Sequence, residues 1–246
     1  MKPKISIITV TYNSAKTLEK TIQSIINQSF ANYEFIIIDG GSNDGTIDII
    51  RKYEKNIAYW VSEPDGGIYD AMNKGILKAN GEWIHLLNSD DYYYDNSVLE
   101  KVSECLVDEN NFYYFTMIQK NGLKENIYKW NSSLWKLWYS AYIPHPTMFV
   151  SKKAYESIGL YDTSFKIAAD HDMILRLINH NINPIFNDVN CSVMVIGGAS
   201  SFDLKKTFTD FKKVTIKNGL NSFIAECIYQ FKIWKYRLIM RPRSEK

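Results

Sequence analysis

Short apolar runs alternate with helical periodicity along the first third of the chain. Four mostly apolar runs have the length of strands that are buried on both faces, and they span 5–10, 35–38, 58–62 and 83–87. Between them, apolar residues recur every three to four positions, which predicts amphipathic helices over 18–28, 47–53 and 68–79. This alternation is typical of an α/β fold with a mostly parallel sheet and flanking helices.

The rest of the chain has a looser pattern. It predicts strands over 112–119, 147–150 and 192–196, and helices over 98–106, 151–158 and 170–178. The aromatic-rich stretch 130–142 fits no regular element, and 197–201 has the composition of a flexible loop. A helical pattern then runs to Arg241, where Pro242 ends it. We expect an α/β domain over 1–202 and a basic amphipathic helical tail over 203–246.

Composition and charge narrow the class of protein. With 246 residues, 46% of them hydrophobic, the chain can bury a large core. The net charge of +2 hides an asymmetry, because the segment from Asp203 onward holds eleven Lys or Arg and four Asp or Glu. A basic terminal segment favours an anionic surface as its partner, and the acidic remainder argues against nucleic acid as the main substrate.

The sequence predicts a protein of the cytoplasm. The opening residues Met1–Lys4 lead directly into a strand, which is not the pattern of a secretory signal. No apolar run approaches the roughly 18 residues that a membrane-spanning helix needs. The cysteines at 105, 191 and 227 lie far apart without CxxC spacing, so neither a disulfide framework nor a zinc site is predicted.

Pairs of carboxylates follow several of the predicted strands or begin predicted helices. These pairs are Asp39/Asp44, Asp65/Asp70, Asp90/Asp91 and Asp170/Asp172. In a parallel sheet, ligands bind outside the carboxyl ends of the strands, so the pairs are expected at one edge. Negative charge gathered there requires a divalent cation or sugar hydroxyls to offset it.

Other chemistries lack their motifs. The loop after the first strand is Thr-Tyr-Asn-Ser, which matches neither a dinucleotide-binding GxGxxG loop nor the Gly-rich phosphate loop of a sugar nucleotidyltransferase. The chain contains no P-loop lysine motif and no GxSxG nucleophile elbow. No cysteine is placed at the start of a helix or in a loop where it could act as a nucleophile. Of the catalytic chemistries considered, catalysis by carboxylates together with a hard metal ion remains.

Four motifs in order resemble glycosyltransferase family 2. They are Val10-Thr11-Tyr12-Asn13, Asp39 with the following Gly41–Thr46, the turn Asn88-Ser89-Asp90-Asp91, and Asp170-His171-Asp172 with Leu175-Arg176. The segment Ser62–Gly75 is similar to the subgroup of bacterial exopolysaccharide and lipopolysaccharide clusters, including the colanic-acid type. The resemblance covers roughly residues 4–200 and implies the GT-A fold, a Rossmann-like nucleotide-binding fold, with inverting transfer from a nucleotide-sugar.

The resemblance also implies roles for the donor side of the site. Thr11 and Tyr12 would line the base and ribose of a UDP-like donor, and Asp39 would hydrogen-bond the base. Asp70 and Lys74 would bound the nucleotide side of the cleft. Asp90 would contact the ribose or the sugar.

The metal and the catalytic base follow from the same resemblance. Asp91 would be the ligand of Mn²⁺ or Mg²⁺, and Asp170 the base. Many relatives have carboxylates where this chain has Asn88 and Ala169. One carboxylate across from the metal suffices for an inverting displacement, because a single proton must leave the acceptor hydroxyl. Mg²⁺ keeps several waters and takes one or two carboxylates, so a lone aspartate is chemically adequate.

Further residues are candidates for contacts to the acceptor or to phosphate. His145 lies between two prolines, and His171 and Asp172 follow the expected base. The aromatic residues of 130–142 could stack on sugar rings or pack in the core. In the tail, an apolar stripe from Phe223 to Leu238 with basic residues near its end predicts a helix on an anionic membrane surface. The alternative is a helix that docks on the body and leaves its charged end in solvent.

The sequence therefore predicts an inverting glycosyltransferase of surface polysaccharide biosynthesis. It would transfer a sugar from a nucleotide-diphosphate-sugar, UDP-linked in our prediction, to a lipid-linked oligosaccharide at the inner face of the plasma membrane. The alternative is a nucleotide-sugar or glycan-binding protein without transfer activity. Consumption of the donor in the presence of an acceptor separates the two.

Overall fold

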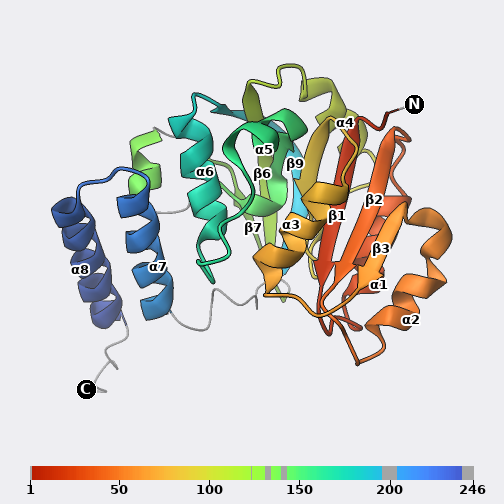
Figure 1. Ribbon diagram of the computed structural model, residues 1–246, viewed down its shortest axis with the longest axis horizontal. Helices are drawn as coiled ribbons and strands as arrows, with labels where there is room; N and C mark the ends of the chain where they lie inside the picture. Colours follow the sequence, from red (N-terminus) through yellow and green to blue (C-terminus); the bar gives the residue numbers. More distant parts are fainter. Residues whose placement is uncertain (1, 123, 131–133, 140–142, 196–203, 240–246) are drawn as a thin grey trace.

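The computed structural model describes residues 2–122, 124–130, 134–139, 143–195 and 204–239 (Figure 1). The strands are β1 Ile5–Thr11, β2 Tyr33–Asp39, β3 Tyr59–Ser62, β4 Trp83–Leu86, β5 Tyr92–Tyr93, β6 Asn111–Asn121, β7 Lys124–Tyr128, β8 Met148–Ser151 and β9 Asn183–Val195. The α-helices are α1 Leu18–Ile26, α2 Thr46–Lys52, α3 Ile68–Lys78, α4 Val98–Cys105, α5 Lys152–Ile158, α6 Ala169–Asn179, α7 Leu204–Lys217 and α8 Ser222–Ile239. Short 3₁₀ helices lie at Glu54–Asn56 (η1), Leu134–Trp138 (η2) and His145–Thr147 (η3).

One mixed sheet joins all the described strands. Its order is β3-β2-β1-β4-β8-β6-β9-β5, and β7 pairs with β6. The four strands predicted from the first third of the chain are parallel neighbours, with Ile8 of β1 opposite Ile36 of β2 and Leu86 of β4. The second half is mixed, because β8 is antiparallel to both β4 and β6, whereas β6 and β9 are parallel. The predicted α/β fold class is confirmed.

The last strand is longer than the sequence pattern indicates. We predicted it to begin at Ser192, whereas β9 begins at Asn183 and pairs with β6 from Asn111 onward. Most residues of its first part are half-buried or exposed, and they include Asn, Asp and Pro, which are depleted in strands. The pairing with β6, which includes register shifts after Phe115, provides the stability that local propensity does not.

Helices cover both faces of the sheet. Helices α1, α2 and α4 pack with Ile5 and Ile7 of β1 on one face, and α3, α5 and α6 pack with Ile8 and Val10 on the other. The alternation of side chains along a strand explains why both sets are apolar. Gly75 allows α3 to lie close to β1, since a Cβ at that position would collide with the Ile8 side chain. The N-terminus of α3 is thereby held at the carboxyl edge of the sheet.

The predicted tail contains two helices. Helix α7 packs against α6, and α8 packs against α7 at the end of the molecule farthest from β3 (Figure 1). Val214 of α7 is fully buried among core residues of the α/β domain. The chain turns between the two helices at Gly219, whose φ of +109° suits glycine. Arg241 and the predicted loop 197–201 lie outside the described residues.

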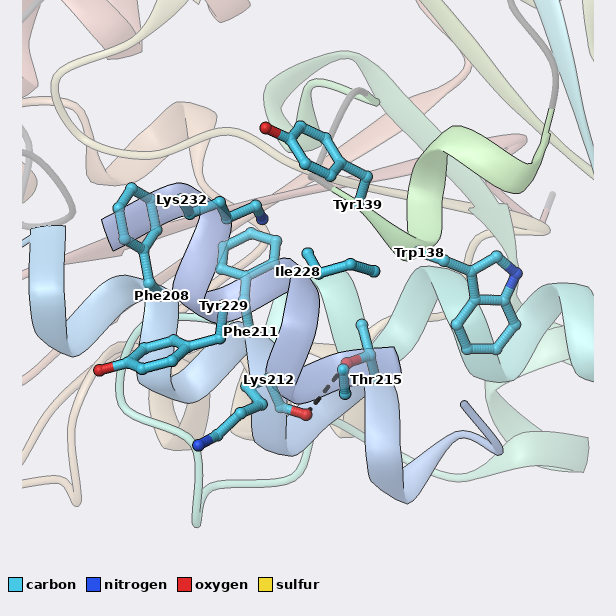
Figure 2. A pocket seen from close by; sticks show the side chains of 10 residues that line it. Trp138, Tyr139, Phe208, Phe211, Lys212, Thr215, Ile228, Tyr229 and Lys232 are labelled. Carbon is cyan, nitrogen blue, oxygen red and sulfur yellow. Dashed lines mark hydrogen bonds between the residues drawn. The ribbon is translucent and has the colours of Figure 1, made fainter. Parts of the chain in front are cut away.

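A small pocket lies between η2, α7 and α8 (Figure 2). The Lys232 ammonium lies over the rings of Tyr139, Phe208 and Phe211, 4.7, 5.7 and 5.2 Å from their centroids. Burial lowers the pKa of Lys232 to about 8. This lysine, which the sequence pattern groups with the basic end of the tail, therefore faces the body of the protein.

Over the described part of the chain, no helix combines the length and hydropathy needed to cross a bilayer.

Candidate active site

Hydrogen bonds join the loops that follow β1, β2 and β4 at the carboxyl edge of the sheet. The Asn13 amide donates to Ser42 Oγ at 2.8 Å, and the Asn43 amide donates to Asn13 Oδ1 at 3.0 Å. The Ser89 hydroxyl of the Asn88–Asp91 turn donates to Ser14 Oγ at 2.9 Å. Residues distant in sequence are thus brought onto one surface, as the strand order predicts.

Asp39 organises the loop that follows β2. Its carboxylate accepts hydrogen bonds from the Gly41 and Ser42 amides at 3.1 and 2.9 Å and from the Ser62 hydroxyl at 2.6 Å, and also from the Ser42 hydroxyl. The side chain is 0% exposed. Three of these donors bind Oδ2, and Oδ1 accepts only from the Ser42 hydroxyl. Full burial argues against the predicted direct contact of Asp39 with the base of the donor, and the hydrogen bonds show that Asp39 shapes the loop.

Tyr12 is the most open of the predicted donor-binding residues. Its side chain is 64% exposed, whereas Thr11 beside it is buried, with a hydroxyl oxygen that has no hydrogen-bond partner. Gly40 lies between Tyr12 and Asp65, since an added Cβ would be 3.3 Å from Tyr12 Cδ2 and 2.7 Å from Asp65 Oδ2. The exposed ring and this close approach give the loops a flat, open face next to a carboxylate.

We did not assign Asp65 a role from the sequence. It follows β3 in a Pro-Asp-Gly-Gly segment, and its Oδ1 accepts a hydrogen bond from the Gly67 amide at 2.8 Å. The sequence indicated only that Asp65 follows a strand. The choice between Asp65 and Asp70 as a residue of the donor site requires the geometry of the loop. Only the structure places Asp65 beside Tyr12 and Gly40.

Asp70 and Lys74 hold the loop between β3 and α3. Asp70 Oδ2 accepts from the Gly66 amide at 2.9 Å. The Lys74 ammonium lies 2.8 Å from a Glu63 carboxylate oxygen and 3.8 Å from Asp70. The Glu63 hydrogen bond is the main cause that raises the pKa of Lys74. Both predicted residues thus fix the loop between β3 and α3.

The two adjacent aspartates of the Asn88–Asp91 turn have different surroundings. Asp90 is half-buried, and burial raises its pKa. Asp91 is only 2% exposed, and burial, with a further contribution from the Asp90 charge, raises its pKa well above the ordinary range. Asp91 Oδ1 is buried without a hydrogen-bond partner, although the Asn88 side chain stabilises the carboxylate. Burial therefore argues against the direct metal contact predicted for Asp91.

Asp90 fits a divalent cation better. A backbone hydrogen bond favours its ionised form, but no side chain among the residues that the structure describes donates to it or forms an ion pair with it, so its negative charge lacks a cationic partner. The described ranges contain no cluster of three His, Cys, Asp or Glu that could hold a metal by itself. A cation here would need oxygens from a bound ligand as well, which is how Mg²⁺ commonly binds phosphates.

Asp170 lies in the first turn of α6. The His171 amide donates to its Oδ1 at 2.8 Å, which favours the ionised form, but burial dominates and raises the pKa of Asp170 to about 6. A carboxylate with this pKa is ionised near neutral pH and still basic enough to accept a proton. The predicted base therefore has suitable electrostatics.

Two contacts bring Asp170 to the donor loops. The Tyr69 hydroxyl of α3 donates to the Ile167 carbonyl at 2.6 Å, and Lys166 Nζ donates to the Gly66 carbonyl at 3.4 Å. Tyr69 also stacks on Tyr161, with ring centroids 5.7 Å apart. The segment before α6 is thus fixed against the loop that follows β3. The sequence gives no sign of this role for Tyr69, because its position on α3 has the pattern of a core residue.

Two of the predicted acceptor contacts are structural residues. His171 is fully buried, its ring centroid lies 4.7 Å from that of Phe211, and burial lowers its pKa to about 3. Asp172 is fully buried and paired with Arg176 at 2.8 Å and Lys217 at 3.1 Å. Full burial argues against the predicted contacts of His171 and Asp172 with the acceptor or phosphate, and Asp172 is in addition held by two cations.

His145 and the aromatic stretch have mixed surroundings. His145, in η3, is half-buried, and burial lowers its pKa to about 4, so the neutral imidazole predominates at neutral pH. Its Nε2 is buried without a hydrogen-bond partner, which leaves the predicted contact open. Trp130 packs in the core, Trp135 is exposed, and Trp138 lines the pocket in Figure 2. Tyr142 lies outside the described residues.

Sequence comparison gives a consistent result. The profile described as "Glycosyl transferase family 2" matches residues 6–163. An uncharacterized glycosyltransferase of Mycobacterium tuberculosis is 36% identical over 179 residues, which cover 71% of this chain and 68% of the relative. A PGL/p-HBAD biosynthesis glycosyltransferase of Mycobacterium bovis is 26% identical over 248 residues, with 97% and 95% coverage.

Structural comparison shows the same fold in solved enzymes. S. aureus TarS 1-349 in complex with UDP-GlcNAc has a TM-score of 0.69 at 19% identity, covering 92% of this chain and 70% of that one. A mannosyltransferase of Pyrobaculum calidifontis in complex with GDP-Man and Mn²⁺ also has a TM-score of 0.69, at 17% identity, with 93% and 70% coverage.

Proposed function

The chain belongs to glycosyl transferase family 2, and from this membership and the geometry of its cleft we propose that it moves a sugar with inversion from a UDP-sugar to a lipid-linked glycan. The predictions of a GT-A fold and of a glycosyltransferase are confirmed. The inverting course, the UDP moiety, the acceptor and a role in surface polysaccharide biosynthesis are the proposed parts. Binding without transfer is the alternative.

One observation carries the inverting mechanism. Two carboxylates that lack a cationic partner among the described residues, Asp90 and Asp170, come from elements far apart in the sequence. The contacts of Tyr69 and Lys166 fix the segment before Asp170 against α3 and the loop after β3. Asp90 follows β4, another strand of the same parallel half of the sheet. One carboxylate can then serve the departing diphosphate and the other the attacking hydroxyl, which a single displacement requires.

The loops at the sheet edge provide the donor site. We propose that the exposed Tyr12 ring stacks on the base and that Asp65, next to Gly40, accepts a hydrogen bond from the base or ribose. Thr11 and Asp39 support this surface from below. The nucleotide complexes of TarS and the Pyrobaculum enzyme support a nucleotide-sugar as the donor.

A Mn²⁺ or Mg²⁺ ion fits at Asp90. It would neutralise charge that develops on the leaving diphosphate. Asp90 would hold it directly, and Asp91, buried behind the turn, would support the turn. This assignment moves the metal contact from Asp91 to Asp90, because a carboxylate that shares a cation with the diphosphate must be accessible. Asp170 accepts the proton of the acceptor hydroxyl at one of its carboxylate oxygens.

A lipid-linked acceptor at the inner membrane face agrees with the surface of α8. Its exposed apolar residues recur at spacings of three and four and form one stripe: Phe223, Cys227, Phe231, Trp234 and Leu238. The exposed cations Lys235 and Arg237 lie beside the end of this stripe. Such a helix suits an anionic lipid surface, with aromatic rings at headgroup depth and cations near the phosphates.

We expect Phe231→Ser/Trp234→Ser to weaken binding to phosphatidylglycerol-containing vesicles by roughly tenfold or more, since two half-exposed aromatic side chains leave the interface. Flotation of the full-length protein measures this. The matched control is Leu77→Ser/Val107→Ser, which removes exposed apolar side chains from the body instead. Equal flotation of both double variants would refute the membrane surface on α8.

Transfer itself is tested with a panel of donors and simple acceptors. Thermal stabilisation by UDP-glucose, UDP-galactose, UDP-GlcNAc and GDP-mannose, with and without Mn²⁺ or Mg²⁺, selects the donor. Product formation is then followed with methyl glycosides of glucose, galactose, mannose and N-acetylglucosamine and with alkyl-diphosphate-linked sugars. Stabilisation without donor consumption under all these conditions would favour the binding protein over the enzyme.

A further inference from the structure

Asp210 of α7 is a buried carboxylate without a partner. Its side chain is 8% exposed, and its Oδ2 is buried without a hydrogen bond. No ion pair joins it to any residue in the described ranges. A buried, unpaired carboxylate costs stability, so its presence requires either a structural reason or a ligand.

Helix packing places Asp210 beside the start of α6. The Phe211 ring of α7 lies 4.7 Å from the His171 ring of α6, and Asn179 Nδ2 at the end of α6 donates to the Asn218 carbonyl at 3.0 Å. The two helices therefore run in the same direction. Asp210, which precedes Phe211, is at the level of Asp170, which precedes His171.

Tyr69 links the two carboxylates. Burial is the largest cause that raises the pKa of the Tyr69 hydroxyl, and the charges of Asp170 and Asp210 both add to it. Both carboxylates therefore act electrostatically on this hydroxyl, which already donates to the Ile167 carbonyl. Tyr69 cannot use its single proton to satisfy Asp210.

The position suits the acceptor better than the donor. In Figure 1, α7 lies on the side of α6 away from β1, β2 and β3, whose loops form the donor side. A carboxylate without a cation repels phosphate, whereas sugar hydroxyls are neutral hydrogen-bond donors.

We propose that Asp210 is an acceptor-binding residue whose carboxylate accepts a hydrogen bond from a sugar hydroxyl next to the one that Asp170 deprotonates. The ligand class is a polyhydroxylated glycosyl unit. The proposal rests on the proposed transfer function. It also assigns a binding role to α7, which lies beyond the residues that the family profile matches.

The test compares wild type, Asp210→Asn and the control Glu226→Gln in the full-length protein. Glu226, on the adjacent α8, is half-exposed and paired with Lys212, so its substitution removes the same charge at a different helix. The probe is the methyl glycoside that the wild type glycosylates fastest. We expect Asp210→Asn to raise KM for this glycoside about tenfold or more, because a hydrogen bond to a charged group is lost.

Two further readouts distinguish acceptor binding from a structural role. Asp210→Asn should bind UDP with Mg²⁺ like the wild type and should melt at the same or a higher temperature, since an unpaired buried charge is gone. An unchanged KM for the glycoside would overturn the proposal, and a lowered melting temperature with unchanged KM would identify Asp210 as structural. Absence of transfer by the wild type would count against the proposed function and, with it, this inference.

Discussion

Asp170→Asn is expected to reduce transfer about 10²–10⁴-fold while UDP still binds with wild-type affinity. The variant keeps the shape of the side chain and removes its ability to accept the acceptor proton, and general bases contribute rate factors of about this size. Steady-state transfer to the preferred methyl glycoside, with calorimetry of UDP binding, measures both effects. Turnover within tenfold of wild type would remove Asp170 from the role of base.

The same residue predicts the pH dependence. The ionised carboxylate is the active form, and burial raises its pKa to about 6. We therefore expect kcat/KM to rise about tenfold per pH unit below 6 and to level above it. A base with the ordinary pKa of an aspartate would give a flat profile over this range.

Asp172→Asn is the contrasting variant on the same helix turn. Asp172 is buried and paired with Arg176 and Lys217, so its neutralisation leaves cations without their partner and should lower the melting temperature. Asp170 has no such partner among the described residues, and its neutralisation should not destabilise the fold. Thermal unfolding of the two variants separates the catalytic from the structural carboxylate.

Asp90→Asn is expected to abolish the metal dependence of UDP binding and to lower transfer roughly 10²–10³-fold. The physical reason is the loss of the accessible carboxylate that holds the cation, whose charge stabilisation is worth several kcal/mol. Calorimetric titration of UDP with and without Mn²⁺ measures the binding effect. Metal-dependent UDP binding that survives in Asp90→Asn would contradict the assignment.

Asp91→Asn provides the comparison. Burial favours the neutral form of Asp91, which the amide mimics, so we expect metal-dependent UDP binding to persist in this variant. If Asp91→Asn instead loses the metal and Asp90→Asn retains it, the ligand is Asp91, as the sequence alone suggested.

The hydrophobic pattern of one segment was sufficient to predict those strands whose burial does not depend on a particular neighbour. The runs at 5–10, 35–38 and 83–87 are apolar on both faces because parallel strands are covered on both sides, so they could be predicted without knowledge of their neighbours. The first part of β9 could not, since its stability comes from pairing with β6.

The candidate site also has features that the sequence could predict and features that it could not. The carboxylates after the strands were found because strand ends gather at one edge of a parallel sheet. Their roles depend on what surrounds each side chain: Asp39 is occupied by four protein donors, and Asp91 lies behind the turn while Asp90 is accessible. The exposure of a side chain can differ between two adjacent residues, because it depends on which other segments pack against each of them.

The sequence alone determined the parallel half of the sheet, the acidic edge, the family resemblance and Asp170 at the start of a helix. The tertiary structure decided that His171 and Asp172 are packing and pairing residues, that Lys232 faces aromatic rings, and that Asp210 is buried with an unpartnered oxygen. The reason is physical: hydrophobic periodicity is a property of one segment, whereas burial, charge pairing and accessibility arise between segments that only folding brings together.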